Sequence, residues 1–332
     1  MRLMKLPHTT LLLVAAIAVA LPPFSRAVAA QAYPSRPITV IVPYAAGGPT
    51  DAVARILAER MRTALGQPII IENVSGATGS IGVGRAVRAP ADGYTVLAGT
   101  LTSNVFTGAL YALRYDLLAD LRPVALLADG PFILVARKTM AASDLKQLMA
   151  WLKANPDKAS QGTGGFGAAE HLAALLLQQQ TGLRFQIVPY RGNSPAVQDL
   201  VGAQIDIMFA DGAVGLPNLR AGLIKAYAVT AKNRLTAAPD IPTVDEVGLP
   251  GFYASLWYGL WAPARTSQEV VAKLNAAAAD ALADATVRAR LVDLGFEIFP
   301  REQQKPAALA ALQKAEIEKW WPIIKEFGIK GE

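Results

Sequence analysis

The 332-residue sequence contains no cysteine and only two histidines, His8 and His171. Without cysteine there are no disulfides, thiol nucleophiles or thiolate metal ligands, so stability must come from the packed core. One histidine beyond residue 30, among scattered carboxylates, gives no metal-ligand spacing. The same histidine would have to serve any Ser-His-Asp triad, and Ser194 lacks the G-x-S-x-G frame. We therefore expect no metal, no cofactor and no enzyme activity.

Clustered charge and nucleotide motifs are missing as well. Arg2, Lys5 and Arg26 fall within the first 30 residues, which leaves 29 basic and 26 acidic side chains, a net charge of +3. These positive charges are scattered, so we expect no nucleic-acid partner. The glycine stretches 79–82 and 164–167 match neither the dinucleotide fingerprint nor the P-loop.

Residues 1–30 have the composition of a cleavable signal peptide. Arg2 and Lys5 precede an apolar run from Thr10 to Leu21, and small residues follow at 27–30. The run is too short to span a membrane comfortably, and two prolines end it. No cysteine stands at the cleavage point to carry a lipid, and no second run of about 18 apolar residues follows. We expect the mature protein to be exported from the cytoplasm.

The stretch 38–65 organises the chain that follows. Its β-branched residues 38–42 predict a buried strand, Gly47 and Gly48 predict a tight turn, and Thr50 or Asp51 is placed to cap a helix. Backbone N–H groups at the start of such a helix bind anions. The stretch therefore predicts an anion site, with an ordinary strand-to-helix turn as the alternative.

The same strand–glycine loop–helix plan recurs along the chain, which predicts an α/β fold. The strands are expected at 38–42, 69–73, 94–98, 122–127, 132–136, 187–190, 205–209, 224–231, 257–263 and 298–299. One helix is expected to follow the glycine-rich turn 76–84 and to end at about residue 89. Further helices are expected at 143–154, 168–181, 195–202, 270–283, 286–294 and 306–326. Small polar loops follow several of these strands, at 76–84, 99–104, 159–167, 191–195 and 210–212. In an open parallel sheet, such loops lie together at the carboxyl ends of the strands, where ligands bind.

Residues 33–38 and 42–51 resemble the start of a mature Bug-type solute-binding protein, the periplasmic receptor of tripartite tricarboxylate transporters. The resemblance continues in family order over essentially the whole mature chain. Its further landmarks are 65–68, 73, 76–82, 91–94, 190–192, 202–206, 260–264 and 319–320.

The resemblance implies a two-domain periplasmic-binding-protein (flytrap) fold with a cleft between the domains. Domain 1 would comprise residues 31–131 plus 251–332, and domain 2 residues 132–250. The cleft would bind a small organic anion, a carboxylate or an aromatic acid, for delivery to integral membrane transporter subunits. We expect a monomer.

Carried over by the resemblance, the ligand site draws on loops of both domains. From domain 1 it takes Tyr44, Ala45, Ala46, Gly47, Gly48, Pro49, Thr50, Asp51, Gly76, Ala77, Thr78, Gly79, Thr100, Thr102, Ser103 and Asn104. From domain 2 it takes Thr163, Gly164, Gly165, Phe166, Gly167, His171, Tyr190, Arg191, Gly192, Asn193 and Asp211. The loop 163–167 carries less serine than is usual in the family, and Phe166, with Glu170 close by, suggests a ligand that is flat or aromatic.

Several of these residues have two interpretations. Arg191 either clamps a carboxylate or is a solvated hinge arginine. His171 either contacts the ligand or packs structurally, and Asp51 is either a helix cap or a catalytic carboxylate. Asp211 would repel an anion unless the ligand carries an amino group. Two other functions share this plan: a secreted α/β enzyme that acts on a small carboxylate, and a ligand sensor for a membrane signalling partner.

Overall fold

The computed structural model describes residues 33–331. The signal peptide predicted at residues 1–30 lies outside the described residues. Within the described part, no helix is at once long and apolar enough to cross a membrane.

The first of two sheets has six strands in the order β11-β4-β10-β3-β1-β2. Its strands are β1 (Ile38–Val42), β2 (Ile69–Asn73), β3 (Thr95–Thr100), β4 (Leu121–Pro131), β10 (Ser255–Pro263) and β11 (Glu297–Ile298). β1 runs parallel to β2 and β3, as the sequence predicts, whereas β10 is antiparallel to both β3 and β4. The sheet is therefore mixed. We call the part of the molecule built on it lobe 1.

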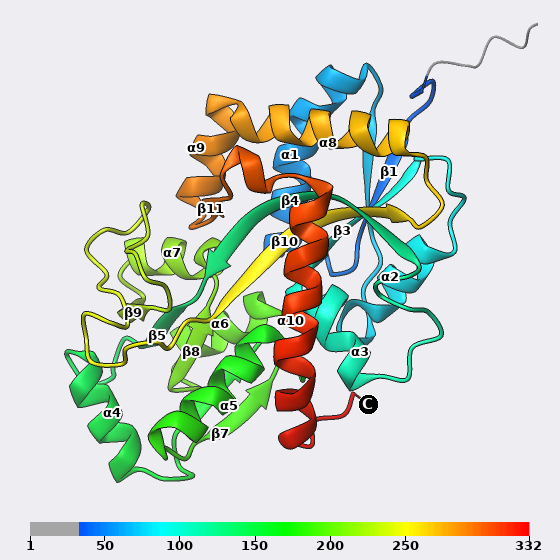
Figure 1. Cartoon of the computed structure of the whole chain (residues 1–332). Coiled ribbons are helices and arrows are strands. Elements are labelled where there is room, and N and C mark those ends of the chain that lie inside the picture. The colour runs from blue at the N-terminus through cyan, green and yellow to red at the C-terminus, as the bar shows by residue number, and fades with distance from the viewer. Residues whose placement is uncertain (1–32, 332) are drawn as a thin grey trace, which may run out of the picture.

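Six of the α-helices found within residues 33–331 belong to lobe 1. They are α1 (Pro49–Leu65), α2 (Ser80–Val87), α3 (Thr107–Leu110), α8 (Gln268–Ala283), α9 (Ala285–Asp293) and α10 (Pro306–Glu326). Helices α1, α8 and α9 pack on one another, and α10 packs on β4 and α3 (Figure 1). Short helical turns lie at η1 (Ala77–Gly79), η2 (Thr102–Phe106) and η3 (Arg301–Gln303).

The second sheet has five strands in the order β7-β6-β8-β5-β9 and forms what we call lobe 2. Its strands are β5 (Ile133–Arg137), β6 (Ser160–Thr163), β7 (Gln186–Pro189), β8 (Ile207–Ala210) and β9 (Ile224–Val229). Its helices are α4 (Leu145–Ala154), α5 (Ala169–Thr181), α6 (Asn193–Val201) and α7 (Gly212–Arg220). The sequence did not predict α7, because Pro217 within it disfavours a helix.

The chain passes between the lobes twice, and the two crossings are hydrogen-bonded to each other. β4 leads through Phe132 directly into β5, and β9 returns through a long connection to β10, as Figure 1 shows. The Thr230 backbone N–H donates to the Phe132 carbonyl at 2.8 Å, and the Thr230 hydroxyl donates to the Ala254 carbonyl at 2.5 Å. Both crossings are thus fixed at one point between the sheets.

The hydrophobic core extends through both lobes. Trp261 and Tyr258 on β10 and Phe106 at the end of η2 are among its largest buried side chains in lobe 1, and Phe209 on β8 is among the largest in lobe 2. Phe132, at the crossing, is also fully buried. Burial on this scale replaces the disulfides that a chain without cysteine cannot form.

Candidate functional site

The turn between β1 and α1 is braced by a carboxylate of the chain itself. Asp51 accepts hydrogen bonds from the Gly47 backbone N–H at 2.9 Å, Arg55 Nε at 2.8 Å and Asn73 Nδ2 at 3.0 Å. Burial alone would raise the pKa of Asp51, but these hydrogen bonds hold it below its ordinary value. The predicted cap is wrong: Gly48 is the N-cap residue, without a side-chain hydrogen bond. The Gly47 N–H, one of the predicted anion donors, is therefore already bonded to Asp51.

Neutral hydroxyl groups gather where the loops after β1 and β3 meet. The Tyr44 hydroxyl lies 2.8 Å from Thr100 Oγ1, and the Thr100 N–H donates to Ser103 Oγ at 3.0 Å. A side chain on Gly79 would approach Ser103 Cβ to 2.9 Å, so η1 also lies against this group. Burial raises the pKa of Tyr44 to about 12, so its hydroxyl stays protonated. Lobe 1 thus presents uncharged polar groups here.

The predicted loop 99–104 is partly helical, which corrects the sequence analysis. β3 continues to Thr100, and residues 102–106 form a turn of π-helix, η2. Gln313 of α10 donates to the Asn104 carbonyl at 2.9 Å, and the Trp320 ring meets Phe106 edge-on at 5.2 Å. Contacts from a helix some 200 residues later hold this turn, and isolated π turns are frequent at functional sites.

His171 in lobe 2 has a structural contact. Its Nδ1 accepts a hydrogen bond from the Gly167 backbone N–H at 2.8 Å, and burial lowers the pKa of His171 to about 4. The ring is therefore neutral at pH 7 and braces the loop after β6. The Phe166 ring packs against it at 4.8 Å and stays 45% exposed.

Two buried carboxylates of lobe 2 share one amide. Asn193 Nδ2 donates to Glu170 Oε1 and to Asp211 Oδ2, at 2.6 Å each, and Asp211 also caps α7 through the Val214 N–H at 3.2 Å. Burial raises the pKa of Glu170 to about 7, with a smaller contribution from the Asp211 charge, and burial also raises the pKa of Asp211. A side chain on Gly164 would collide with Asn193, so glycine is required there. No group of three or more His, Asp or Glu side chains within residues 33–331 is placed to hold a metal ion.

Loops of the two lobes touch at the predicted site residues. The Thr78 hydroxyl lies 2.8 Å from the Tyr111 hydroxyl and 3.3 Å from the Phe166 carbonyl, which accepts a hydrogen bond from it. A side chain on Gly167 would come within 2.5 Å of Leu110 Cδ1. The loop after β6 therefore lies directly against η1 and α3.

The remaining predicted residues lie around this contact with differing exposure. Ala45, Ala46, Gly47, Gly76, Phe166 and Arg191 are exposed; Tyr44, Gly48, Pro49, Ala77, Thr78, Gly164, Gly165, Tyr190, Gly192 and Asn193 are partly buried; Thr50, Asp51, Gly79, Thr100, Thr102, Ser103, Asn104, Thr163, Gly167, His171 and Asp211 are buried. The Tyr190 hydroxyl, from the loop between β7 and α6, donates to Asp199 of α6 at 2.7 Å and does not join the others. Arg191 forms no ion pair with any residue from 33 to 331.

Two residues at this junction were not among the predicted site residues. Tyr258 of β10 pairs with Thr100 of β3 in the sheet and is 1% exposed. Burial raises the pKa of Tyr258 well above 10, and the charges of Asp211 and Glu170 raise it further. Tyr258 reaches this junction because β10 pairs with β3 in an antiparallel register. The amino-acid sequence alone does not reveal that register. Glu170 was noticed only as a neighbour of Phe166.

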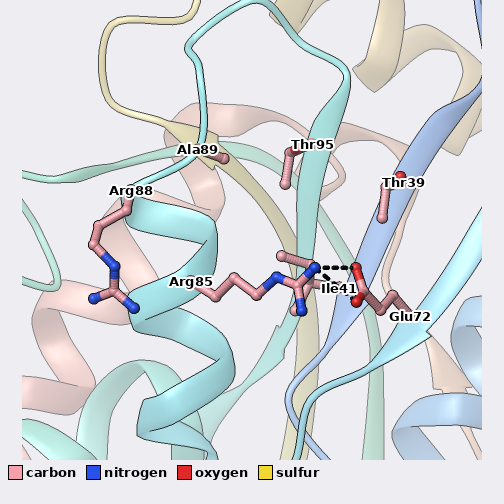
Figure 2. A pocket seen from close by; sticks show the side chains of 7 residues that line it. All are labelled: Thr39, Ile41, Glu72, Arg85, Arg88, Ala89 and Thr95. Carbon is pink, nitrogen blue, oxygen red and sulfur yellow. Dashed lines mark hydrogen bonds and ion pairs between the residues drawn. The ribbon is translucent and has the colours of Figure 1, made fainter.

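A surface pocket of about 350 Å³ lies elsewhere, between α2 and strands β1 to β3. Figure 2 shows Arg85 directed at Glu72, with Nη2 2.7 Å from Oε1, and Arg88 directed away from both. Thr39 and Thr95 on its wall lie at the amino ends of their strands, opposite the ends from which the glycine loops leave. Since Glu72 neutralises Arg85, we do not place an anion site here.

Comparisons with known proteins give one consistent result. A family model described as "Tripartite tricarboxylate transporter family receptor" matches residues 53–329. Protein BugT of Bordetella pertussis is 33% identical over 97% of this chain and 98% of its own length. The structure of periplasmic binding protein BugD is 38% identical, with a TM-score of 0.83 over 90% of this chain and all of BugD. MatC of Rhodopseudomonas palustris with bound malate is 41% identical, with a TM-score of 0.82 over 88% of this chain and all of MatC.

The comparisons confirm the predicted fold. Two mixed α/β sheets, each with its own helices, are the architecture of the two-domain periplasmic binding proteins to which this chain is similar. The likeness extends over nearly all of both chains, so both lobes and their connections are shared.

Proposed function

The chain belongs to the tripartite tricarboxylate transporter receptor family, and from that premise we propose that it binds a small organic anion and delivers it to membrane transporter subunits. The ligand is held where the loops of lobe 1 and lobe 2 meet. The protein acts in the periplasm as a monomer. The signal peptide predicted at residues 1–30 supports this location.

One observation carries the proposal: the polar loops of both lobes converge on one place. The Thr78 hydroxyl of lobe 1 bonds the Phe166 carbonyl of lobe 2, and the Tyr44–Thr100 pair lies on the same side of lobe 1 as η1. A ligand at this point touches both lobes, as a receptor that closes around its solute requires.

The ligand class is a carboxylate. The bound malate of MatC supports this assignment, because MatC is similar to this chain over nearly its whole length. Neutral donors such as Tyr44 and Ser103 suit a carboxylate, since hydrogen bonds to an ionised acceptor are about twice as strong as neutral ones. The ligand-binding residues we propose are those carried over by the family resemblance, except Tyr190, whose hydroxyl is bonded to Asp199, and Arg191, which is exposed to solvent.

Closure occurs at the two crossings. We place the domain boundaries at 131/132 and 250/251, as the sequence predicts, because Phe132, Thr230 and Ala254 tie both crossings together. A ligand that contacts both domains binds the closed form more tightly and shifts the population toward it. The shift is limited by that difference in affinity.

The enzyme alternative lacks a histidine base. His171 is the one histidine among residues 33–331, its Nδ1 already accepts the Gly167 N–H, and its lowered pKa keeps it a poor proton acceptor. The family is one of receptors, which also supports binding without turnover. A sensor for a signalling partner would use the same closure, and the presence or absence of transport separates the two roles.

A thermal-shift screen of mature protein against mono-, di- and tricarboxylates, aromatic acids and amino acids tests the proposal. A ligand at about a hundred times its dissociation constant adds about 2.7 kcal/mol of stability. Stabilisation by one class of acids, without consumption of the acid, is the expected result. Consumption of the acid supports the enzyme, and no response to any acid overturns the carboxylate proposal.

A pair of glycine variants locates the site. Gly48 has an ordinary φ of −83°, and its nearest contact for a side chain is the Ala45 carbonyl at 3.6 Å. We expect Gly48→Trp to fold and to lose binding by at least about tenfold. Gly202→Trp, at an exposed glycine with a φ of −74° after α6, is the matched control. Equal affinity in both variants would mean that the ligand lies elsewhere.

A further inference from the structure

The turn η1 has a backbone conformation that residues other than glycine rarely adopt. Ala77 and Thr78 have positive φ angles of 45° and 56°, although neither is glycine. Gly76 and Gly79, on either side, also have positive φ angles, 130° and 98°. A non-glycine residue in this region is strained, and it keeps the conformation only when its contacts hold it there. The contacts of Thr78 therefore decide whether the turn keeps its shape.

The hydroxyl of Thr78 lies between an acceptor in lobe 2 and a donor in lobe 1. It is 3.3 Å from the Phe166 carbonyl oxygen and 2.8 Å from the Tyr111 hydroxyl oxygen. Because a carbonyl has no proton, Thr78 must donate to Phe166. The single proton of Thr78 is then used, so the Tyr111 hydroxyl must donate to Thr78 Oγ1. A directed chain of hydrogen bonds thus runs from Tyr111 through Thr78 to lobe 2, and the bonds of such a chain strengthen one another.

Tyr111 is itself held by a distant part of the chain. The segment after α10, residues 327–331, returns to the end of α3, as the red end of the chain shows in Figure 1. The Gly331 backbone N–H donates to the Leu110 carbonyl at 2.8 Å. A side chain on Gly331 would overlap the Tyr111 ring, so glycine lets the backbone lie directly against that ring. Ile329 is buried in the core of lobe 1 and anchors the segment.

We propose that Tyr111 is a positioning residue for closure: supported by residues 329–331, it holds Thr78 in its strained conformation and directs the Thr78 hydroxyl at lobe 2. The inference rests on the proposed function, because it assumes that closure of the lobes retains the ligand. Leu110, the other residue that the segment contacts, also meets lobe 2, since a side chain on Gly167 would collide with it. A segment more than 200 residues further along the sequence thus sets how readily the lobes close.

A double-mutant cycle on binding separates positioning from general structural support. Tyr111→Phe, Thr78→Val and the double variant are measured by calorimetry, and the probe is the carboxylate that most stabilises the mature protein in the thermal-shift screen. We expect Tyr111→Phe alone to weaken binding by at least about threefold and to have no further effect beside Thr78→Val, because Tyr111 acts through that hydroxyl. Equal losses in both backgrounds, or no loss, overturn the positioning role.

A tyrosine of lobe 2 provides the matched control. The Tyr227 hydroxyl donates to the Ala142 carbonyl at 2.8 Å, away from the loops of the proposed site. Tyr227→Phe removes one bonded hydroxyl, as Tyr111→Phe does, and should bind the probe as tightly as the wild type. A threefold loss in Tyr227→Phe as well would show that any lost hydroxyl weakens binding, which overturns the role of Tyr111.

Gly331→Ala tests the support from the segment after α10. The added methyl group overlaps the Tyr111 ring, so we expect a loss of affinity of at least about threefold, as for Tyr111→Phe. Gly202→Ala makes the same change at an exposed glycine with a φ of −74°, where the nearest contact is the Gln198 carbonyl at 3.4 Å, and should leave the affinity unchanged. Wild-type affinity in Gly331→Ala overturns the role of the segment.

Amide hydrogen exchange of the unliganded protein tests the same chain without a probe. The reporter is the Gly79 N–H, which donates to the Gly76 carbonyl at 3.0 Å across the turn. We expect it to exchange at least about threefold faster in Tyr111→Phe than in the wild type or in Tyr227→Phe, because the strained turn has lost a contact. Unchanged exchange overturns the role of Tyr111 and leaves the proposed function standing. If no acid in the screen binds, the proposed function falls, and faster exchange still supports the positioning of Thr78 by Tyr111.

Discussion

Lobe 1 and lobe 2 bring polar groups of different charge to the junction between them, neutral hydroxyls from lobe 1 and carboxylates from lobe 2. In lobe 1, Tyr44, Thr100 and Ser103 are neutral and bond one another. In lobe 2, Glu170 and Asp211 are buried carboxylates that share the amide of Asn193. Neutral hydroxyls cost little to bury once paired, whereas buried carboxylates stay costly until a charge or a proton reaches them. The chemistry of lobe 1 therefore suits carboxylates in general, and that of lobe 2 restricts the choice.

The largest expected effect comes from the amide that joins the two acids. Asn193→Ala leaves Glu170 and Asp211 without their shared donor, and each unsatisfied buried acceptor costs about 1–3 kcal/mol. We expect the free energy of unfolding at pH 7 to fall by about 4 kcal/mol, measured by urea denaturation.

A second asparagine in lobe 2 provides the control. Asn218 donates to one neutral carbonyl, that of Val214, at 2.8 Å and is partly buried. Asn218→Ala should cost only about 1 kcal/mol. If the two variants lose the same stability, the acids of lobe 2 do not depend on the shared amide, and the contrast between the lobes disappears.

The next effect is a pH dependence from Glu170. Because burial raises the pKa of Glu170 from 4.5 to about 7, the folded protein keeps a proton that the unfolded chain loses between these values. The free energy of unfolding therefore decreases as the pH rises from 4.5 to about 7, by roughly 3 kcal/mol in total. The stabilising contribution of Glu170 is fully present below this range and absent above it. The glutamine in Glu170→Gln cannot titrate. The free energy of unfolding of the variant, relative to that of the wild type, should therefore increase by about this amount between about pH 5 and pH 8.

Unfolding of both proteins at several pH values checks this difference. His171 titrates with the opposite sign, because burial lowers its pKa from 6.5 to about 4, and its stabilising contribution is lost as the pH falls through that range. The histidine is present in both proteins, so its contribution cancels. A stability difference that does not change with pH would show that Glu170 is not the titrating group.

A smaller effect is expected in lobe 1. Tyr44→Phe removes the hydroxyl that pairs with Thr100, which should lower the free energy of unfolding by about 1 kcal/mol. Tyr258→Phe removes a buried hydroxyl without a partner and should not destabilise the unliganded protein. Urea denaturation of both variants compares them. A larger loss for Tyr258→Phe would mean that its hydroxyl is bonded in the unliganded protein.

Local sequence predicted the parts of the fold that depend on local pattern. The strand 38–42, the helix ending at 65 and the final helix 306–326 all lie where hydrophobic periodicity and glycine or proline place them. The helix α7 was missed because of Pro217, and the π turn η2 depends on Gln313 and Trp320 far along the chain.

The site was less predictable because it depends on tertiary structure. Glu170, Asn193 and Asp211 come from the starts of three helices, and only the packing of lobe 2 brings them together. Tyr258 reaches the junction through the register of β10 against β3. The polar loops predicted the region of the proposed site, but the pairing of Asn193 with the two acids depends on the three-dimensional arrangement.

The smallest expected effect concerns the one cation among the predicted site residues. If Arg191 clamps a carboxylate, its truncation should weaken binding by at least about tenfold, as the loss of a charge-assisted hydrogen bond does. Its exposure and its lack of an ion pair within residues 33–331 favour the solvated arginine. We therefore expect Arg191→Ala to change the free energy of unfolding by less than about 0.5 kcal/mol and the affinity by less than about twofold, measured by calorimetry with a stabilising acid. A tenfold loss would instead give lobe 2 a positive group, and the carboxylate of the ligand would then face lobe 2.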